Sequence, residues 1–496
     1  MFKKRSILIV LFSGLFVCQA ISTCHVSISN HFVYEKSVML SQAGYLAVPN
    51  MFTASHLADV SSAIYGGLFF TLSIGAGLTV ISFIIAFMWV FIFRKKVFYL
   101  KLFIFFQLMS ILLLNLKGIN IFPTLYVLLI PPTVFGLTVR LAIIPTQKYC
   151  LKFHLLSHAI SLLILAFLWG TQMSDKMFIN VRDTLLLSNP VGLKLNTFYY
   201  DYTLHAAETF RPVGNKLVKT YRLHHLNNPL LERSLHLVLL KNDYCAVQTG
   251  QTVDLDISID GQDLIFSHQN KHILDIPANR FLSDYNEVLS DISNKCDKNR
   301  FFRFLTIICL LIGLPLMLYA IVFLALFSFL CLFFPSKVST VIVSVTGVFI
   351  GAMILLPVYI IGQISPEYND ISTYLKSDSH YKRIQALKEI NDDQLNLTAF
   401  DGYKDILSGH CVPELYWAVR ALGKCRTEAA YNILIMFLDS KDINIVCMAF
   451  YSLGVMKNKR AIEEIIDRIK RSDNWYQQWY AYNALRSLKW RQTGLN

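Results

Sequence analysis

The sequence is poor in charged residues. Asp, Glu, Lys and Arg make up 16% of its 496 residues, against about 25% in a typical soluble domain. Hydrophobic residues make up 54% of the chain, and the mean hydropathy is +0.46. These values exclude a disordered chain and an ordinary soluble globular protein. They indicate a membrane protein that carries soluble regions.

Acidic residues are almost absent outside two regions of the chain. Residues 172–300 hold 14 Lys/Arg and 15 Asp/Glu, and residues 363–496 hold 18 and 16. The rest of the chain holds 14 basic residues but only two acidic ones, Glu35 and Asp59. The formal net charge of +13 therefore arises between hydrophobic segments, as the positive-inside rule describes. Neither soluble region is basic enough to neutralise phosphates, so we expect no nucleic-acid partner.

Motifs of catalysis and metal binding are also missing. The sequence contains no Gly-rich phosphate loop, HExxH helix, nucleophile elbow or CxxC pair. Its ten cysteines are scattered without the spacing of a zinc site. We therefore expect no cofactor, no metal and no catalytic residues. The pairs His154/His158 and His205/Glu208 each share a helix face, but a structural or solvated role is the more ordinary interpretation.

The N-terminus has the features of a secretory signal. Lys3-Lys4-Arg5 precedes the apolar run Ile7–Val17, and Cys18-Gln19-Ala20 offers a cleavage point. We interpret residues 1–20 as a signal peptide, with an uncleaved anchor as the alternative. Residues 21–63 are then an exported N-terminal segment in both cases.

Six further segments are long enough to cross about 30 Å of hydrocarbon. Four of them form a transmembrane region over residues 64–171, and two form a hairpin over residues 301–362. They run Ile64–Phe93, Val97–Leu116, Ile119–Ile144, His154–Gly170, Phe304–Phe334 and Val338–Ile361. Pro131-Pro132 indicates that the third is either a kinked span or a re-entrant segment, and the latter would reverse the orientation of everything downstream.

The basic turns between these segments predict one orientation. Three basic turns alternate with the other loops along the chain, so we expect all three on the inner side of the membrane. They contain Arg94-Lys95-Lys96, Lys148 with Lys152, and Lys337. The protein is then integral to the inner (plasma) membrane, with the lipid bilayer as one partner. Both soluble regions lie on the outer, periplasmic side. Ionisable residues are scarce within the spans, which argues against active transport.

Residues 172–300 read as a small extramembrane α+β domain. The aromatic cluster Phe198–Tyr202 suits either the membrane surface or a small core. Alternating apolar residues from Val253 to Ile259 lead into Asp260-Gly261, which predicts a β-hairpin. A helix is expected near Phe281–Ile292. In an exported domain, Cys245 and Cys296 are a candidate disulfide.

The C-terminal region, residues 363–496, contains a repeat. The segment from Leu415 to Gly423 recurs from Val446 to Gly454 and again from Gln478 to Arg486, each copy with an alanine four residues before a leucine. A degenerate earlier copy contains Ala386-Leu387. The leucines of the four copies, at positions 387, 422, 453 and 485, are spaced by 35, 31 and 32 residues. A period near 30 residues signals a helical solenoid. Second helices are expected at Glu428–Leu438 and Arg460–Ile469.

This pattern resembles HEAT-like repeats of the phycobilisome-lyase type, over about residues 380–490. The resemblance implies an α-solenoid whose curved surface binds another protein, and it implies no catalytic residue. The spans and residues 172–300 indicate no family. Aromatic residues are enriched at binding hot spots, so we take as candidate partner-binding residues Trp417, Trp475, Trp479, Tyr480 and Trp490. Packing of the last repeat and contact with the bilayer surface are the alternative roles of such aromatics.

The predicted architecture is a polytopic α-helical membrane protein with an α+β domain and a C-terminal α-solenoid. It favours a non-enzymatic scaffold or assembly protein that binds an unknown partner protein through its repeats. A permease or channel subunit is the second hypothesis. A membrane-embedded lipid-modifying enzyme that uses His154, His158 or His205 is the third.

Overall fold

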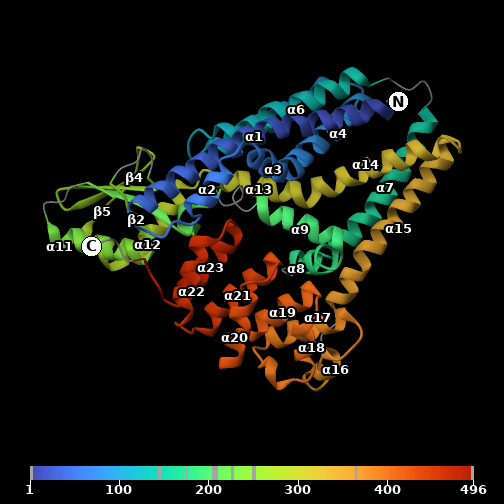
Figure 1. Cartoon of the computed structure of the whole chain (residues 1–496). Helices are drawn as coiled ribbons and strands as arrows, with labels where there is room; N and C mark the ends of the chain where they lie inside the picture. Colours follow the sequence, from blue (N-terminus) through green and yellow to red (C-terminus); the bar gives the residue numbers. More distant parts are fainter. Residues whose placement is uncertain are drawn as a thin grey trace. The chain divides into compact units, whose positions relative to one another are not determined.

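The protein divides into two compact units, each built from three separate stretches of chain (Figure 1). The computed structural model describes residues 4–142, 148–174, 176–203, 210–224, 228–248, 253–363 and 366–492. Unit 1 comprises Met1–Ile28, Val60–Met177 and Lys298–Ile360, and unit 2 comprises Ser29–Asp59, Phe178–Asp297 and Ile361–Asn496. Neither unit can therefore fold from one continuous segment.

The helices of unit 1 account for the apolar segments. Seven helices in the described chain are long and apolar enough to cross a membrane, one more than the six spans expected after a signal sequence. They are built from α1 (Lys4–Gln42), α3 (Val60–Phe70) continued by η1 (Thr71–Gly75) and α4 (Ala76–Phe91), α5 (Val97–Asn115), α6 (Ile121–Leu141), α7 (Lys148–Gly170), α13 (Arg300–Ile308) continued by η4 (Cys309–Gly313) and α14 (Leu314–Leu330), and α15 (Ser336–Gly362). A mostly helical architecture with apolar helices fit for a membrane is thus confirmed.

Helix α1 runs without a break through Ala20, the expected cleavage point. Within unit 1, Gln19 Nε2 donates to the Ile64 carbonyl at 2.9 Å, and Thr71 Oγ1 donates to Gln19 Oε1 at 2.7 Å. Gly14 lets α1 approach α4, because a Cβ there would lie 2.3 Å from Thr79 Oγ1. The segment expected to be a signal peptide is therefore packed into the helices of unit 1, and the expected exported segment begins as a continuation of α1 through Gln42.

Helix α6 is continuous where a re-entrant segment was the alternative, and it contains Pro131 and Pro132. Pro131 cannot donate to the carbonyl four residues before it, which belongs to Val127. Gln107 Nε2 of α5 donates to this carbonyl at 3.0 Å. A side-chain amide thus satisfies the polar group that the proline leaves open, as a helix in hydrocarbon requires.

Residues 178–297 of unit 2 contain the expected sheet. Five strands run in the order β2-β1-β3-β4-β5, with β1 parallel to β2 and β3 and the other pairs antiparallel. The strands are β1 (Lys219–Leu223), β2 (Tyr244–Ala246), β3 (Leu255–Asp260), β4 (Asp263–His268) and β5 (Lys271–Pro277). Their helices are α8 (Met177–Val181) continued by η2 (Arg182–Leu186), α9 (Pro190–Tyr202), η3 (Val213–Asn215), α11 (Pro229–Lys241) and α12 (Ala278–Cys296).

The predicted hairpin is confirmed as β3 and β4, joined at Gly261 with a φ of +60°. Ile257 pairs with Phe266 across the two strands, and both side chains are fully buried. Phe281 and Ile292 of α12 cover this apolar face, which confirms the expected helix. Alternation of apolar and polar residues therefore placed the sheet correctly.

Asp254 lies beside the start of β3 and ties the sheet to α1. Its Oδ2 accepts from Lys36 Nζ at 2.5 Å and from the Thr220 amide at 2.9 Å, and its Oδ1 lies 3.6 Å from Lys216 Nζ. Burial alone would raise the pKa of Asp254, but Lys36, Lys216 and the Thr220 amide lower it well below 3.8. The carboxylate is therefore held ionised inside unit 2.

Residues 366–492 form short helices. They are η5 (Tyr368–Asp370), α16 (Ile371–Leu375), α17 (His380–Asp392), η6 (Leu397–Ala399), α18 (Tyr403–Ser408), α19 (Val412–Leu422), α20 (Glu428–Phe437), α21 (Ile443–Met456), α22 (Ala461–Arg471) and α23 (Trp475–Ser487). Helices α20 and α22 lie where second helices of the repeat were expected. Helices α17, α19, α21 and α23 pack against one another in succession. Asp442 occupies the N-cap position of α21, but its side chain makes no capping bond there.

The segment after α1 packs on the last of these helices. Asn50 caps α2 (Met51–Leu57), and its Nδ2 donates to the carbonyls of Ile469 and Ser472, each at 2.9 Å. Gln492 Oε1 accepts from the Leu46 amide at 2.7 Å, and Gln492 Nε2 donates to the Leu46 carbonyl at 3.0 Å. Side-chain amides thus join residues at opposite ends of the sequence within unit 2.

Asp254→Asn tests the buried ion pairs. The substitution leaves Lys36 and Lys216 without their carboxylate, so we expect a loss of about 3 kcal/mol in unfolding free energy at pH 7. Because the pKa of Asp254 is lower in the folded state, the stabilisation is present above pH 3.8 and lost as the pH falls through the folded pKa. Thermal unfolding of the detergent-solubilised protein measures the loss. Asp260→Asn, at an exposed position of the hairpin, is the control, and an equal shift in both variants would contradict the account.

Candidate functional site: a groove across helices α19, α21 and α23

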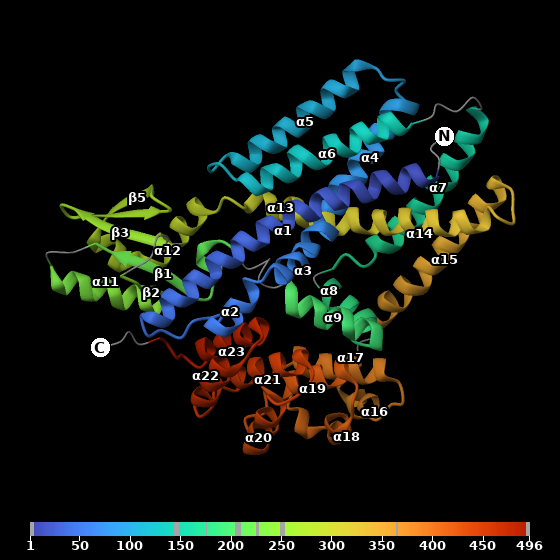
Figure 2. The same ribbon diagram turned by 45° about the horizontal axis from the view of Figure 1, so that its top comes forward.

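Three helices of unit 2, which alternate with α20 and α22 along the chain, border a groove. Figure 2 shows α19, α21 and α23 side by side, and neighbours in this series pack against each other. The groove between them, the α19–α21–α23 groove, has a volume of about 570 Å³. It is lined by Tyr416, Arg420, Met448, Tyr451, Trp479, Tyr480, Asn483, Ala484, Arg486, Ser487 and Arg491.

The register of the sequence repeat decides which residues face this groove. Ala418, Ala449 and Ala481 occupy one position of the repeat, and all three are fully buried between the helices. The residue two positions later lies about 200° around a helix, and in the three copies it is Arg420, Tyr451 and Asn483, all of which line the groove. Each copy therefore contributes an equivalent position, but with a different side chain.

The charge of the groove lining is entirely positive. It includes Arg420, Arg486 and Arg491 and no Asp or Glu among the described residues. Arg486 Nε pairs with Asp243 Oδ2 outside the lining, at 2.9 Å. Arg491 Nη1 donates to the carbonyls of Trp490 and Arg486, at 2.6 and 3.3 Å. Burial and the neighbouring Arg486 charge lower the pKa of Arg491, although Asp243 opposes the shift.

Arg420 is held by rings instead of by a carboxylate. Its Cζ lies 5.1 Å from the centroid of the Trp417 ring and 5.2 Å from that of Tyr451, both within cation–π range. Its Nε is buried and has no hydrogen-bond partner in the described part of the chain. The neighbouring rings position this guanidinium, and because its Nε is buried, the donors left for another group are its Nη nitrogens.

Two of the five predicted aromatic residues line the groove. Trp479 and Tyr480 are half-buried there, and Arg211 lies over the Trp479 ring with its Cζ 5.3 Å from the centroid. Trp475 is buried, and Trp490 packs edge-on against Tyr482 with a centroid distance of 6.2 Å. We therefore retain only Trp479 and Tyr480 of the last repeat as candidate binding residues.

Trp417 contacts the interior of unit 2 and leaves the candidate set as well. Its side chain is 4% exposed, and its Nε1 donates to Asp183 Oδ2 at 2.9 Å. The same oxygen lies 3.0 Å from Lys388 Nζ of α17, and Asp183 Oδ1 lies 2.6 Å from Arg182 Nη2. Asp183 thereby fixes α17 and α19 to η2. The enrichment of aromatic residues at binding hot spots had suggested Trp417, but its contacts hold helices of unit 2 together.

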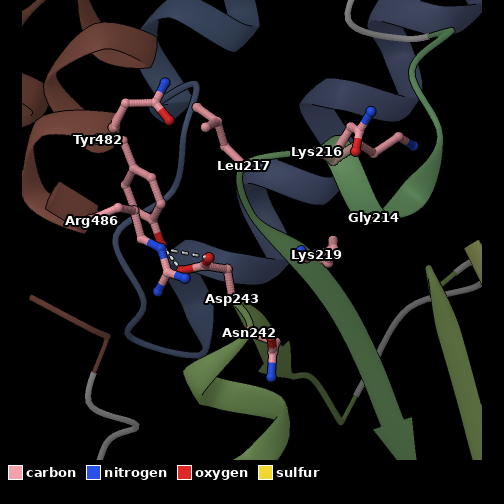
Figure 3. Close-up of a pocket in the computed structure, with 10 residues that line it drawn as sticks. Gly214, Lys216, Leu217, Lys219, Asn242, Asp243, Tyr482 and Arg486 are labelled. Carbon is pink, nitrogen blue, oxygen red and sulfur yellow. Dashed lines mark hydrogen bonds and ion pairs between the residues drawn. The ribbon is translucent and has the colours of Figure 1, made fainter. Parts of the chain in front are cut away.

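A second, smaller cavity adjoins the groove, because Asn483 and Arg486 of α23 line both. Figure 3 shows Tyr482 and Arg486 reaching from α23 to Asp243, in a cavity of about 290 Å³ that Lys216 and Lys219 also line. The Tyr482 hydroxyl donates to Asp243 Oδ1 at 2.9 Å. Burial raises the pKa of Asp243, although Arg486 and Tyr482 oppose the shift, and burial lowers the pKa of Lys219 to about 8.

Ionisable groups with shifted pKa values in a cavity can mark a functional site. Here, however, Asp243 and Lys219 already interact with neighbouring residues of the protein. Both oxygens of Asp243 are engaged by α23, and Lys219 Nζ lies 4.7 Å from the centroid of the Tyr244 ring. We interpret this cavity as the join between the sheet and α23.

The candidate disulfide does not form, because Cys245 is a free buried thiol. Successive side chains of a strand point to opposite faces. Tyr244 packs in the same apolar cluster as Cys296, whereas Cys245 belongs to the cluster that contains the C-terminal helices. The two sulfurs therefore lie on different sides of the sheet.

The two described histidine candidates, His154 and His158, each contact a residue of a neighbouring helix. His154 Nδ1 lies 2.7 Å from Thr340 Oγ1, and His158 Nδ1 lies 3.0 Å from the Tyr319 hydroxyl, both between helices of unit 1. His205 and Glu208 lie outside the described residues. No group of three His, Cys, Asp or Glu that could hold a metal ion occurs in the part of the chain that the structure describes.

Comparisons with known protein families, with curated proteins and with solved structures find no match for the chain. The described lining of the groove offers guanidinium groups, tyrosine and serine hydroxyls, aromatic rings and an amide, and it contains no carboxylate, imidazole or thiol. Aligning the three copies and reading the position two residues after each alanine would have found Arg420, Tyr451 and Asn483 from the sequence.

Trp417→Phe separates the structural aromatic from the groove aromatics. Phenylalanine keeps a buried ring but removes the donor to Asp183, so we expect a loss of about 1–2 kcal/mol in stability. Differential scanning fluorimetry measures the shift, and Trp490→Phe is the matched control, since Trp490 contributes ring packing. A midpoint that moves no more in Trp417→Phe than in the control would show that the Asp183 contact is unimportant.

Proposed function

We propose that the protein is a membrane-anchored assembly protein that holds a partner protein in the α19–α21–α23 groove and catalyses no reaction. One observation carries the proposal. Equivalent positions of three sequence repeats line a single groove, and its arginines and aromatic side chains are those typical of binding hot spots. The apolar helices of unit 1 supply the anchor.

The proposal includes a HEAT-like stack for residues 380–490. Its support is the packing of the repeated residues. Leu387, Leu422, Leu453 and Leu485 are all fully buried. A Cβ on Gly423 would lie 2.9 Å from the Cα of Ser452, and one on Gly454 would lie 3.0 Å from the Cα of Ala484. The glycine that ends each central copy therefore allows close approach to the next helix, as stacked repeats require.

The proposal also includes a topology in which unit 2 faces the outside. The three stretches of unit 2 begin within the last part of the first apolar helix, after the fifth and at the end of the seventh, so an even number of complete helices separates them. Segments separated by an even number of crossings lie on the same side of a membrane, which agrees with their assembly into one unit. The intervening turns hold Arg94-Lys95-Lys96 and Lys337, which the positive-inside rule puts inside. In this topology α1 is a retained span.

Epitope tags test the topology. We expect tags inserted at Gly261, a hairpin turn with open space around it, and after Asn496 to react with antibody added to intact spheroplasts. A tag in the turn at Lys95 should react only after permeabilisation, because the basic turn lies inside. A tag at Gly261 and a tag after Asn496 found on opposite sides would contradict the topology, and both found inside would reverse it.

Site-specific photo-cross-linking tests the function. We expect a benzophenone amino acid at Tyr451, which is 37% exposed in the groove, to give a discrete cross-linked protein in intact cells. The matched control is the same group at Met436 of α20, which is 60% exposed and does not line the groove. Equal products at both positions, or none at Tyr451, would overturn the proposal.

A permease is the second candidate function, and one observation favours it. The π-helical segments η1 and η4 pack against each other in unit 1, and π-helical turns often occur at functional sites. Solute flux through liposomes that contain the purified protein would support a permease. Flux would not depend on groove residues such as Tyr451, which separates the two functions.

A further inference from the structure

We propose that the occupant of the α19–α21–α23 groove is an extended acidic segment of the partner protein, with one carboxylate bound by Arg420. This inference rests on the proposed function and names the chemistry of the partner. It is carried by the charge of the groove lining, by the position of the Arg420 guanidinium between two aromatic rings and by the width of three helices. Each of these observations constrains a different property of the ligand.

The positive charge of the groove lining requires an anionic ligand. Three arginines line the groove and no Asp or Glu does, among the described residues. Arg486 is already paired with Asp243, and the Arg491 donors reach backbone carbonyls, which carry no charge. The positive charge of Arg420 and Arg491 is therefore not neutralised by an ion pair within the described lining, and an acidic ligand would provide the complement.

The geometry of Arg420 selects a carboxylate bound at a fixed place. Its guanidinium lies near the rings of Trp417 and Tyr451, which restrict its position, and its Nε is buried, which leaves the two Nη nitrogens as the donors for a ligand. A planar guanidinium that keeps free donors binds a carboxylate through two parallel hydrogen bonds. Restriction by neighbouring rings lowers the conformational entropy that binding would otherwise cost.

The size of the groove selects an extended chain. The groove crosses three helices, and neighbouring helix axes are about 8–10 Å apart, so it is about 16–20 Å long. An extended chain rises about 3.3 Å per residue, so about five or six residues fill it. Tyr416, Met448 and Trp479 offer apolar surface beside the arginines. The expected ligand therefore combines acidic residues with apolar or aromatic ones.

A display selection tests this ligand chemistry. A library of random heptapeptides is selected on the full-length protein in nanodiscs of phosphatidylcholine, and in parallel on Arg420→Gln, Arg420→Lys and Arg426→Gln. Arg426 is an exposed arginine before α20 that does not line the groove, so it is the matched control. We expect the wild type and Arg426→Gln to enrich peptides that pair Asp or Glu with apolar residues.

Removing the guanidinium should abolish this preference. We expect the selected peptides to bind Arg420→Gln roughly tenfold or more weakly, because a charge-assisted hydrogen-bonded pair is lost. Arg420→Lys keeps the charge without the planar fork, so its affinity should fall between those of the wild type and Arg420→Gln. Unchanged circular dichroism and an unchanged thermal midpoint establish that each variant is folded. If Arg420→Gln does not fold, the peptide affinity of Arg420→Lys decides the question.

Several outcomes would overturn the inference. Enrichment of neutral or basic peptides, no enrichment at all, or the same acidic peptides with equal affinity on Arg420→Gln would each do so. Displacement of selected peptides by phosphatidylglycerol vesicles but not by phosphatidylcholine vesicles would identify an anionic lipid as the occupant instead. If Tyr451 still cross-links one protein while the selection shows no acidic preference, the assembly function stands and the acidic ligand is wrong. If both fail, the assembly function falls as well.

Discussion

The close approach of α19, α21 and α23 is the constraint on which the proposed site depends. Alanines fill the contacts between these helices, and glycines at 423 and 454 leave room for the neighbouring backbone. Larger side chains there would separate the helices, and the residues two positions after each alanine would no longer share one groove. The smallest residues of the repeat therefore determine where its largest ones, Arg420 and Tyr451 among them, meet a ligand.

Periodicity explains what the sequence could predict. Long apolar runs predicted the helices of unit 1, alternation predicted the β3–β4 hairpin, and the 31- to 35-residue spacing of leucines led to helices α19 to α23. Each of these signals arises from many residues at a regular interval. Aligning the three copies locates Arg420, Tyr451 and Asn483 at one position of the repeat, but these side chains share no chemistry that marks the position as part of a groove. Aromatic density pointed instead to Trp417 and Trp475, whose size also suits a buried position.

Single polar residues join the parts of unit 2, and these contacts could not be predicted from the sequence. Asp183 fixes α17 and α19 to η2, Asp243 joins the sheet to α23, and Asn50 binds carbonyls at the C-terminal end of α22. In each case the partner lies more than 200 residues away in the chain. No local pattern marks such an aspartate or asparagine as different from one that faces water, so the arrangement becomes visible only in three dimensions.

The distance between Asn50 and Ile469 in the chain has a consequence for how the protein is made. Asn50 leaves the ribosome before the carbonyls that it binds, which are synthesised 419 and 422 residues later. Loop closure over such a separation is slow and entropically costly. The nascent α2 segment must therefore wait through the insertion of every later apolar helix, and during that interval a chaperone at the membrane would find its polar and apolar surfaces uncovered.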